Sequence, residues 1–293
     1  MKEGLWSRRD TSAVYLSGWC SSLYRVLPTF ALIGAMKAGT TTISAVLDSH
    51  PDVFMCSPKE PQFFTTRWAR GIGWYESLFA RAGDAIARGD ASTSYTDYPR
   101  KPEAAERMAT VTPDALLVYV VRDPIQRMRS HYRHRVADGL ESRPVEVALL
   151  DDRYVLRSCY GLQVQQYLRY FAREQLLVLD GADLLGGGPS WQQLFSFLGV
   201  QALVPTVNRA NDTDARMRLR PGTRALRQRL RHNPVYAMAP AGLRAAVRRM
   251  GTRQPSSNDA ADITPDLRAQ LSARLDDDAQ LLRELSGLEV SVS

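Results

Sequence analysis

The sequence is poor in the residues that build disulfide frameworks and metal centres. Its 293 residues include three cysteines, Cys20, Cys56 and Cys159, and four histidines. An odd number of widely spaced cysteines argues against a disulfide framework. His131 and His134 lie three residues apart, but no further ligands accompany them at the spacing of a zinc site. We therefore expect no bound metal and a reducing, cytoplasmic compartment.

Long apolar runs are also missing. No stretch reaches the roughly 18 apolar residues of a membrane-spanning helix, and Arg8, Arg9 and Asp10 interrupt the N-terminus where a signal peptide would be apolar. Residues 1–27 show no sustained hydrophobic period, so we expect a poorly ordered or peripheral segment. Its scattered aromatics are the candidates for a peripheral membrane or partner contact: Trp6, Tyr15, Trp19 and Tyr24.

Positive charge, by contrast, is plentiful. The net charge of +7 favours acidic ligands such as nucleotides, phosphate esters, acidic glycans or anionic membrane surfaces. No zinc-finger, helix-turn-helix or RNA-binding signature accompanies the charge, so we expect no nucleic-acid partner. An arginine-rich insertion at about residues 201–262 has two interpretations of equal weight, a basic loop over an anionic ligand and a solvated surface.

The stretch from residue 29 to residue 47 organises the rest of the chain. An apolar run at residues 30–33 leads into a turn bounded by Gly34 and Gly39, and an amphipathic segment follows from Thr40. This order predicts a buried strand, a tight turn and a helix N-terminus. Such a turn directs backbone amides and the positive end of the helix dipole towards one point, which suits a phosphate or a sulfate.

The lysine of this turn is not where a nucleoside triphosphate loop would have it. Such a loop places lysine directly after the second glycine, with a hydroxyl for magnesium next to it. Here Thr40 follows Gly39, and the cation is Lys37, inside the turn. A nucleotide kinase also needs an acidic magnesium ligand at a strand end, and Asp123, which directly precedes Pro124, is a poor one.

A second strand-loop-helix unit is predicted further along the chain. Residues 115–121 form a continuous apolar run of the kind found in central parallel strands. Arg122 ends the run, and a basic helix follows over residues 125–136. Ligands of open α/β sheets bind at the carboxyl ends of the strands, so we expect this unit to face the first one.

The remaining pattern completes an α/β fold with a central parallel sheet flanked by helices. We expect residues 28–293 to form a single domain that ends in a helix from Thr264 onwards. The other predicted elements are helices at residues 73–81, 102–108, 161–171 and 191–198, a strand at 175–180, and a small-residue loop at 89–95.

Three motifs in this order resemble the sulfotransferase family that uses 3′-phosphoadenosine 5′-phosphosulfate (PAPS), in its bacterial and heparan-sulfate branch. They are the loop at residues 33–41, the Lys-Glu-Pro-Gln-Phe-Phe turn at 59–64, and residues 120–130, which run from Val-Val-Arg-Asp-Pro to Ser130. The resemblance implies a P-loop-like three-layer fold. It also implies transfer of a sulfuryl group to an acceptor hydroxyl or amine, with no need for a metal.

The same resemblance assigns roles to individual residues. Lys37 would neutralise charge on the leaving phosphate oxygen, and Glu60 would be the base that takes the acceptor's proton. The residues implied to bind the 5′-phosphosulfate are Lys37, Ala38, Gly39, Thr40, Thr41 and Thr42; those implied for the 3′-phosphate are Arg122 and Ser130; and those implied for a late basic loop over the donor are Arg218 and Arg220.

Several alternatives remain at this point. A P-loop-like nucleotide kinase would use the same sheet, and a non-enzymatic anion or membrane-surface binder would use the basic residues 209–253. Glu60 has a plain interpretation as a turn carboxylate paired with Lys59, and we expect His50 to be structural. The acceptor, whether a glycan, a lipid or a small molecule, depends on loops whose positions the sequence does not fix, and the oligomeric state is also open.

Overall fold

The computed structural model describes residues 26–207, 218–219, 252–253 and 262–290. Nearly all of the predicted N-terminal segment and most of the arginine-rich insertion, Arg220 included, lie outside the described residues. In the described ranges, no helix is both long enough and apolar enough to cross a membrane.

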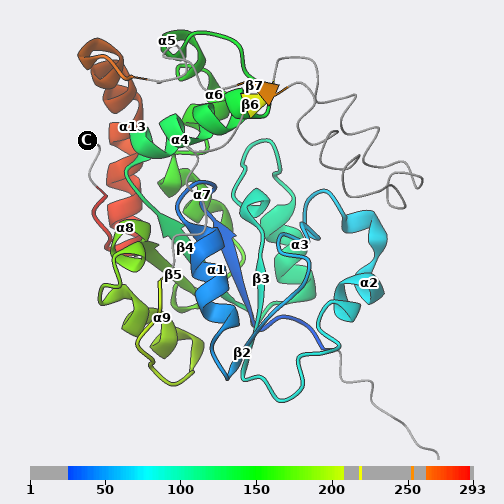
Figure 1. Ribbon diagram of the computed structural model, residues 1–293. Coiled ribbons are helices and arrows are strands. Elements are labelled where there is room, and N and C mark those ends of the chain that lie inside the picture. The colour runs from blue at the N-terminus through cyan, green and yellow to red at the C-terminus, as the bar shows by residue number, and fades with distance from the viewer. Residues whose placement is uncertain (1–25, 208–217, 220–251, 254–261, 291–293) are drawn as a thin grey trace, which may run out of the picture.

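A five-stranded parallel sheet forms the centre of the fold (Figure 1). The strands lie in the order β2-β3-β1-β4-β5, so β1 pairs with β3 on one side and with β4 on the other. Their bounds are β1 Phe30–Gly34, β2 Val53–Met55, β3 Ala87–Ala91, β4 Leu116–Val121 and β5 Leu176–Asp180. The predicted α/β class with a central parallel sheet is confirmed.

Helices cover both faces of this sheet and make the three layers (Figure 1). The α-helices are α1 Thr40–Asp48, α2 Ile72–Ser77, α3 Ala104–Val111, α4 Pro124–Ala137, α5 Val145–Ala148, α6 Asp152–Val155, α7 Tyr160–Tyr167, α8 Gly181–Leu185, α9 Ser190–Leu198 and α13 Pro265–Ser286. Short 3-10 helices are η1 Trp68–Arg70, η2 Thr93–Tyr95 and η3 Arg173–Gln175, and a two-stranded antiparallel ribbon pairs β6 Arg218–Leu219 with β7 Thr252–Arg253.

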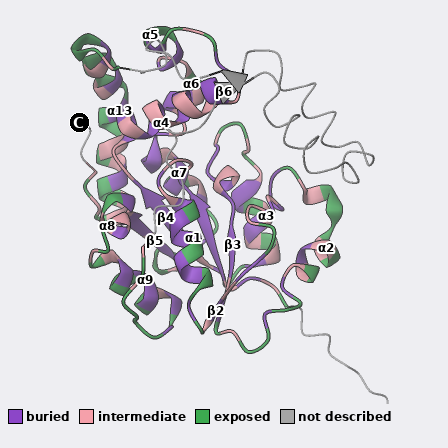
Figure 2. Ribbon diagram, viewed as in Figure 1, coloured by how far each residue is buried: buried purple, intermediate pink, exposed green. Residues whose placement is uncertain are grey.

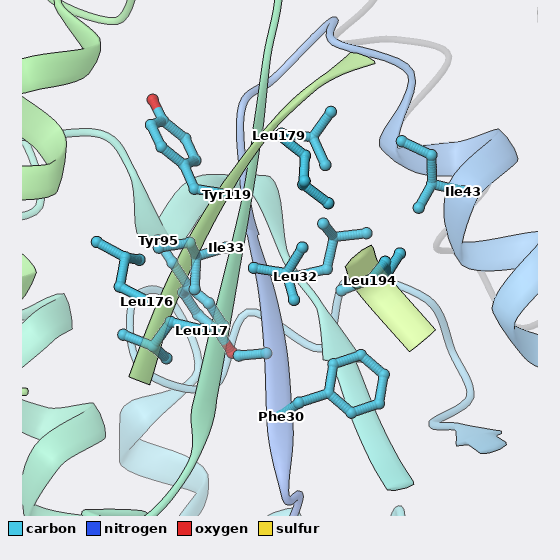
Figure 3. Packing of buried hydrophobic residues seen from close by; sticks show 14 of the residues in the cluster. Phe30, Leu32, Ile33, Ile43, Tyr95, Leu117, Tyr119, Leu176, Leu179 and Leu194 are labelled. Atoms are coloured by element: carbon cyan, nitrogen blue, oxygen red, sulfur yellow. The ribbon is translucent and has the colours of Figure 1, made fainter. Parts of the chain in front are cut away.

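The core lies on both sides of the sheet because the strands are apolar on both faces. The β1 side chains alternate: Leu32 lies on the side of Ile43 from α1 and Leu194 from α9, whereas Ile33 lies with Tyr95 and other residues on the opposite side (Figure 3). The strands are accordingly buried throughout most of their length (Figure 2). This is the expected pattern for parallel strands covered by helices.

The structure corrects the prediction of a loop at residues 89–95. Residues up to Ala91 belong to β3, and η2 follows. Gly89 made this strand hard to recognise, yet the position requires glycine, since a Cβ there would lie 2.3 Å from the Phe30 ring and 2.6 Å from the Met55 sulfur. The buried carboxylate of Asp90 is the second feature that hid the strand, because charged residues are rarely fully buried unless they are paired.

Two predicted helices are shorter than the sequence pattern suggested. The helix predicted at residues 73–81 is α2, which ends at Ser77, and the one predicted at 161–171 is α7, which ends at Tyr167. Phe79 and Phe171 lie beyond these ends but are still buried. In both cases the apolar residues continue beyond the end of the helix because the following segment is buried as well, although it is not helical.

The predicted C-terminal helix is α13, and it packs against α7. The Asp278 carboxylate accepts hydrogen bonds from the amides of Gly161 (2.9 Å) and Leu162 (2.7 Å), so a residue of α13 caps the N-terminus of α7. Thr264 caps α13 itself by accepting from the Leu267 amide at 3.2 Å. Burial raises the pKa of Asp278.

Candidate functional site

The turn between β1 and α1 closes with left-handed backbone. Gly39 precedes α1 with φ of 93°, and a Cβ there would also lie 2.8 Å from Leu185 of α8. Lys37 has φ of 75°, which is uncommon for a residue with a side chain. The turn therefore presents a lysine from strained backbone directly before a helix N-terminus.

Some of the predicted anion-binding amides are already used inside this turn. The Ala38 amide donates to the Ala35 carbonyl at 3.1 Å, and the Thr42 amide donates to the Gly39 carbonyl at 3.0 Å. The amides of Thr40 and Thr41 belong to the first turn of α1, where the helix itself supplies no acceptor. The Thr41 side chain is exposed, whereas those of Thr40 and Thr42 are buried. Of the predicted anion-binding amides, those of Thr40 and Thr41 at the N-terminus of α1 therefore remain as candidates.

Arg122 lies next to this turn, as expected if the second strand-loop-helix unit faces the first. It follows β4, and its guanidinium donates to the Lys37 carbonyl at 3.3 Å. Asp123 caps α4 by accepting from the Gln126 amide at 2.6 Å, which fixes the direction in which the chain leaves the strand. Ser130 lies further along α4 and is partly buried. The backbone of β6, which includes Arg218, lies against α4 (Figure 1).

Glu60 lies in a turn that is strained on both sides of Pro61. Glu60 has φ of 59° and Gln62 has φ of 54°. One Glu60 oxygen accepts from Lys59 at 3.3 Å and from Thr93 at 3.2 Å, and the other accepts from Gln62 at 3.5 Å. The side chain is 33% exposed, so it is held in place but still open to a ligand.

Residues 92–97 connect the Glu60 turn with the β1–α1 turn, and we call them the bridging segment. Thr93 bonds Glu60 at one end of the segment, and Thr96 donates to the Ile33 carbonyl at 3.0 Å at the other. Gly34 packs closely enough on Thr96 that a Cβ would lie 2.2 Å from its hydroxyl. The two predicted catalytic side chains, Lys37 and Glu60, therefore lie on turns that share one support.

The end of the bridging segment forms a buried ion pair. Both carboxylate oxygens of Asp97 accept hydrogen bonds from Arg157, one of them at 2.6 Å from the Arg157 Nε. Arg157 also lies 3.4 Å from the sulfur of Met36, the residue before Lys37. A hollow of about 210 Å³ opens beside this pair and is lined by residues of both charges, including Arg100 and Asp151.

With this geometry in view, comparison with known proteins identifies the family. The profile described as "Sulfotransferase domain" matches residues 27–216. The chain belongs to the sulfotransferase domain family. The match covers β1 to β5 and all three predicted motifs.

Curated relatives of this sulfotransferase chain include human enzymes named for heparan sulfate. The chain is 29% identical over 179 residues to bifunctional heparan sulfate N-deacetylase/N-sulfotransferase 3 of Homo sapiens. This match covers 54% of the chain and 20% of that protein. The chain is 27% identical over 207 residues to heparan sulfate glucosamine 3-O-sulfotransferase 3B1 of Homo sapiens, covering 67% and 52%. The chain thus matches about a fifth to a half of these relatives.

A solved structure shares the fold of this sulfotransferase. The sulfotransferase from Alicyclobacillus acidocaldarius superposes with a TM-score of 0.63 at 24% identity, covering 90% of this chain and 97% of that one. At this level of identity the likeness concerns the fold.

Two histidines of the sulfotransferase, His50 and His131, are buried. His50 lies at the end of α1 farthest from the Lys37 turn; its Nδ1 accepts from the Asp52 amide at 3.1 Å, so Nε2 donates to the Gln201 carbonyl at 2.8 Å. These bonds fit the structural role predicted for His50. His131 is buried in α4, and burial and nearby arginines lower its pKa. Within the described ranges, no group of three His, Cys, Asp or Glu residues is arranged to hold a metal ion.

The sequence did not reveal the role of Asp90 in this sulfotransferase. Its side chain is fully buried and accepts from Tyr75 at 2.8 Å, from Tyr95 at 2.5 Å and from Ser92 at 2.7 Å. Burial raises the pKa of Asp90 from 3.8 to about 6, against the effect of these hydrogen bonds. The usable signal was the spacing of Asp90, Ser92 and Tyr95, which places three polar groups at the carboxyl end of a strand.

Proposed function

We propose that this sulfotransferase moves the sulfuryl group of PAPS to a hydroxyl or amine of an acceptor. The observation that carries the proposal is the hydrogen bond between the guanidinium of Arg122 and the carbonyl of Lys37. It joins the side chain of Arg122 to the backbone of Lys37, and these two basic residues come from separate strand-helix units at the carboxyl edge of one parallel sheet. Ligands bind at this edge in open α/β folds, and the donor carries anionic groups at both ends.

The roles of the binding residues follow from their chemistry. Arg122 forms charge-assisted hydrogen bonds with the 3′-phosphate, and Ser130 donates a hydroxyl to it. The α1 N-terminus, with the hydroxyls of Thr40 and Thr41, holds the 5′-phosphosulfate. Lys37 neutralises the phosphate oxygen that leaves when its bond to sulfur breaks.

We assign the proton transfer to Glu60. The acceptor oxygen or nitrogen attacks the sulfur, the bond between sulfur and the bridging oxygen breaks, and Glu60 takes the acceptor's proton. The hydrogen bonds from Thr93 and Lys59 support this role because they orient the carboxylate without burying it completely. A positioned carboxylate of this kind typically contributes about 10²- to 10⁴-fold to a rate.

The acceptor classes to test are glycans, lipids and small metabolites. Relatives named for heparan sulfate are described as N-sulfotransferases and as glucosamine 3-O-sulfotransferases. We therefore propose that the acceptor atom here is a nitrogen or an oxygen. A screen with PAPS labelled in its sulfuryl group would identify the acceptor directly.

Thermal stabilisation tests the donor assignment without an acceptor. Adenosine 3′,5′-bisphosphate, the product of the donor, should raise the melting temperature in the absence of magnesium, because a ligand that binds the folded state stabilises it. Stabilisation by ATP with magnesium, but not by the bisphosphate, would indicate a kinase. Stabilisation by neither nucleotide would favour the non-enzymatic binder.

A further inference from the structure

Asp90 lies at the end of β3 and collects three hydroxyl hydrogen bonds in a fully buried site. One carboxylate oxygen accepts from Ser92, and the other accepts from both Tyr75 and Tyr95. Burial raises the pKa of both tyrosines well above the usual range, so both phenols keep their protons and donate them. The carboxylate therefore fixes the direction in which these hydroxyls point.

Two of these hydroxyls also receive hydrogen bonds from the Glu60 turn. The Gln62 amide donates to the Ser92 hydroxyl at 3.0 Å, and the Phe63 amide donates to the Tyr95 hydroxyl at 3.0 Å. A hydroxyl has one proton to donate and lone pairs with which to accept. Because Ser92 and Tyr95 give their protons to Asp90, their lone pairs face the turn. Two parallel chains thus run from a backbone amide through a hydroxyl to the same carboxylate.

The turn needs this support because its backbone is strained. Glu60 and Gln62 both have positive φ, and such residues persist only where the surroundings hold them. The two supported amides are those of Gln62, itself one of the strained residues, and of Phe63, which follows it. Without the carboxylate, the hydroxyls would be free to rotate and the amides would lose their aligned acceptors.

We propose that Asp90 is a positioning residue that holds the Glu60 turn in its working geometry through Ser92 and Tyr95. The proposal rests on the proposed function insofar as Glu60 is the base. In this proposal Asp90, a buried residue, aligns the carboxylate of Glu60, which acts on the acceptor. Alignment of this kind matters because a misplacement of about 1 Å can lower a rate about 100-fold.

The structure provides its own control. Tyr75 and Tyr95 both donate to the same Asp90 oxygen, but only the Tyr95 hydroxyl accepts from the turn. The Tyr75 ring stacks on Phe63 at 4.2 Å between centroids, a contact that phenylalanine would keep. The variants Tyr75→Phe and Tyr95→Phe therefore each remove a hydroxyl that donates to the same carboxylate oxygen, but only Tyr95→Phe also removes the acceptor of a turn amide.

The experiment measures amide hydrogen exchange and turnover in the full chain. Exchange at Gln62 and Phe63 is followed by NMR, and turnover is the release of labelled sulfate when water takes the place of the acceptor. We expect Tyr95→Phe and Ser92→Ala to speed exchange at the turn and to lower turnover about 10- to 100-fold. Tyr75→Phe should stay within about twofold of the unmodified chain, and all three should bind adenosine 3′,5′-bisphosphate normally.

The outcomes separate this proposal from the proposed function. If Tyr95→Phe and Tyr75→Phe have the same exchange and the same turnover, Asp90 does not position the turn through Tyr95, and the inference is wrong while the function stands. If the unmodified chain neither binds the bisphosphate nor releases sulfate from PAPS, the function is wrong. In that case, faster exchange in Tyr95→Phe but not in Tyr75→Phe would still show that Asp90 supports the turn, but the support would have no role in catalysis.

Discussion

The two turns that carry the predicted catalytic residues are held in different ways. The Lys37 turn is fixed largely by its own backbone, through left-handed Gly39 and the hydrogen bond from the Ala38 amide to the Ala35 carbonyl. The Glu60 turn is fixed by side chains about thirty residues further along the chain. A turn that is fixed by its own backbone can be recognised in a short stretch of sequence. A turn that is held by tertiary contacts cannot.

This difference separates donor binding from proton transfer. In the proposed mechanism the Lys37 turn and Arg122 bind the donor, and the Glu60 turn acts on the acceptor. Substitution of Arg122 should mainly change affinity for the donor, and substitution of Glu60 should mainly change turnover. The bridging segment, residues 92–97, is the part of the molecule through which one side could affect the other.

The largest effect is expected from Glu60→Gln. The carboxamide oxygen can still accept from Thr93, so the turn should keep its shape, but it cannot take a proton. Turnover should fall about 10²- to 10⁴-fold, and stabilisation by adenosine 3′,5′-bisphosphate should be unchanged. Glu103→Gln is a matched control, since Glu103 precedes α3 and pairs with Arg107 of that helix. Equal turnover in Glu60→Gln and Glu103→Gln would contradict the assignment of the base.

Arg122→Ala tests the other side of the comparison. Loss of a charged hydrogen-bond donor to phosphate should weaken bisphosphate binding about 10- to 100-fold, measured by calorimetry. Arg129→Ala, which removes a neighbouring arginine paired with Asp262 at 3.3 Å, is the control for loss of charge. Turnover at saturating donor should change less than affinity. A variant that binds the bisphosphate normally would exclude Arg122 from the 3′-phosphate site.

The same contrast explains which features of the molecule could be predicted from its sequence. The Lys37 turn and the unit from β4 through Arg122 to α4 were predicted because periodicity, glycine position and helix caps are local signals. β3 was missed because its sequence, Ala-Arg-Gly-Asp-Ala, contains no apolar run. Only the folded protein shows that Phe30 fills the space at Gly89. The pairing of Asp97 with Arg157 joins residues sixty positions apart, which no local pattern reveals.

The pH dependence of stability tests the burial of Asp90. Its pKa in the folded protein, about 6, is higher than the ordinary value of 3.8, so the folded state holds a proton over a pH range in which the unfolded chain has lost it. The stability contributed by Asp90 is therefore complete below pH 3.8 and is lost as the pH rises through 6, by about 3 kcal/mol in total.

The measurement compares the unmodified chain with Asp90→Asn by chemical denaturation between about pH 4 and 7. The free energy of unfolding of the unmodified chain, relative to the variant, should fall as the pH rises. Tyr75, Tyr95 and Cys56, which also face Asp90, have raised pKa values and stay neutral throughout. Glu60 is the other nearby carboxylate, and repeating the series in Glu60→Gln removes its contribution. A difference that does not vary with pH would mean that Asp90 is not buried as described.

The smallest effect is expected where the bridging segment contacts Glu60 directly. Thr93→Val keeps the shape of the side chain but removes the hydroxyl that donates to Glu60 at 3.2 Å, a bond worth about 0.5–1.5 kcal/mol. Turnover should fall by about 2- to 10-fold and be restored in Thr93→Ser, while hydrogen exchange at Gln62 and Phe63 stays unchanged. If Thr93→Val instead loosened the turn as much as Tyr95→Phe, the single side-chain contact, rather than the Asp90 network, would hold Glu60 in place.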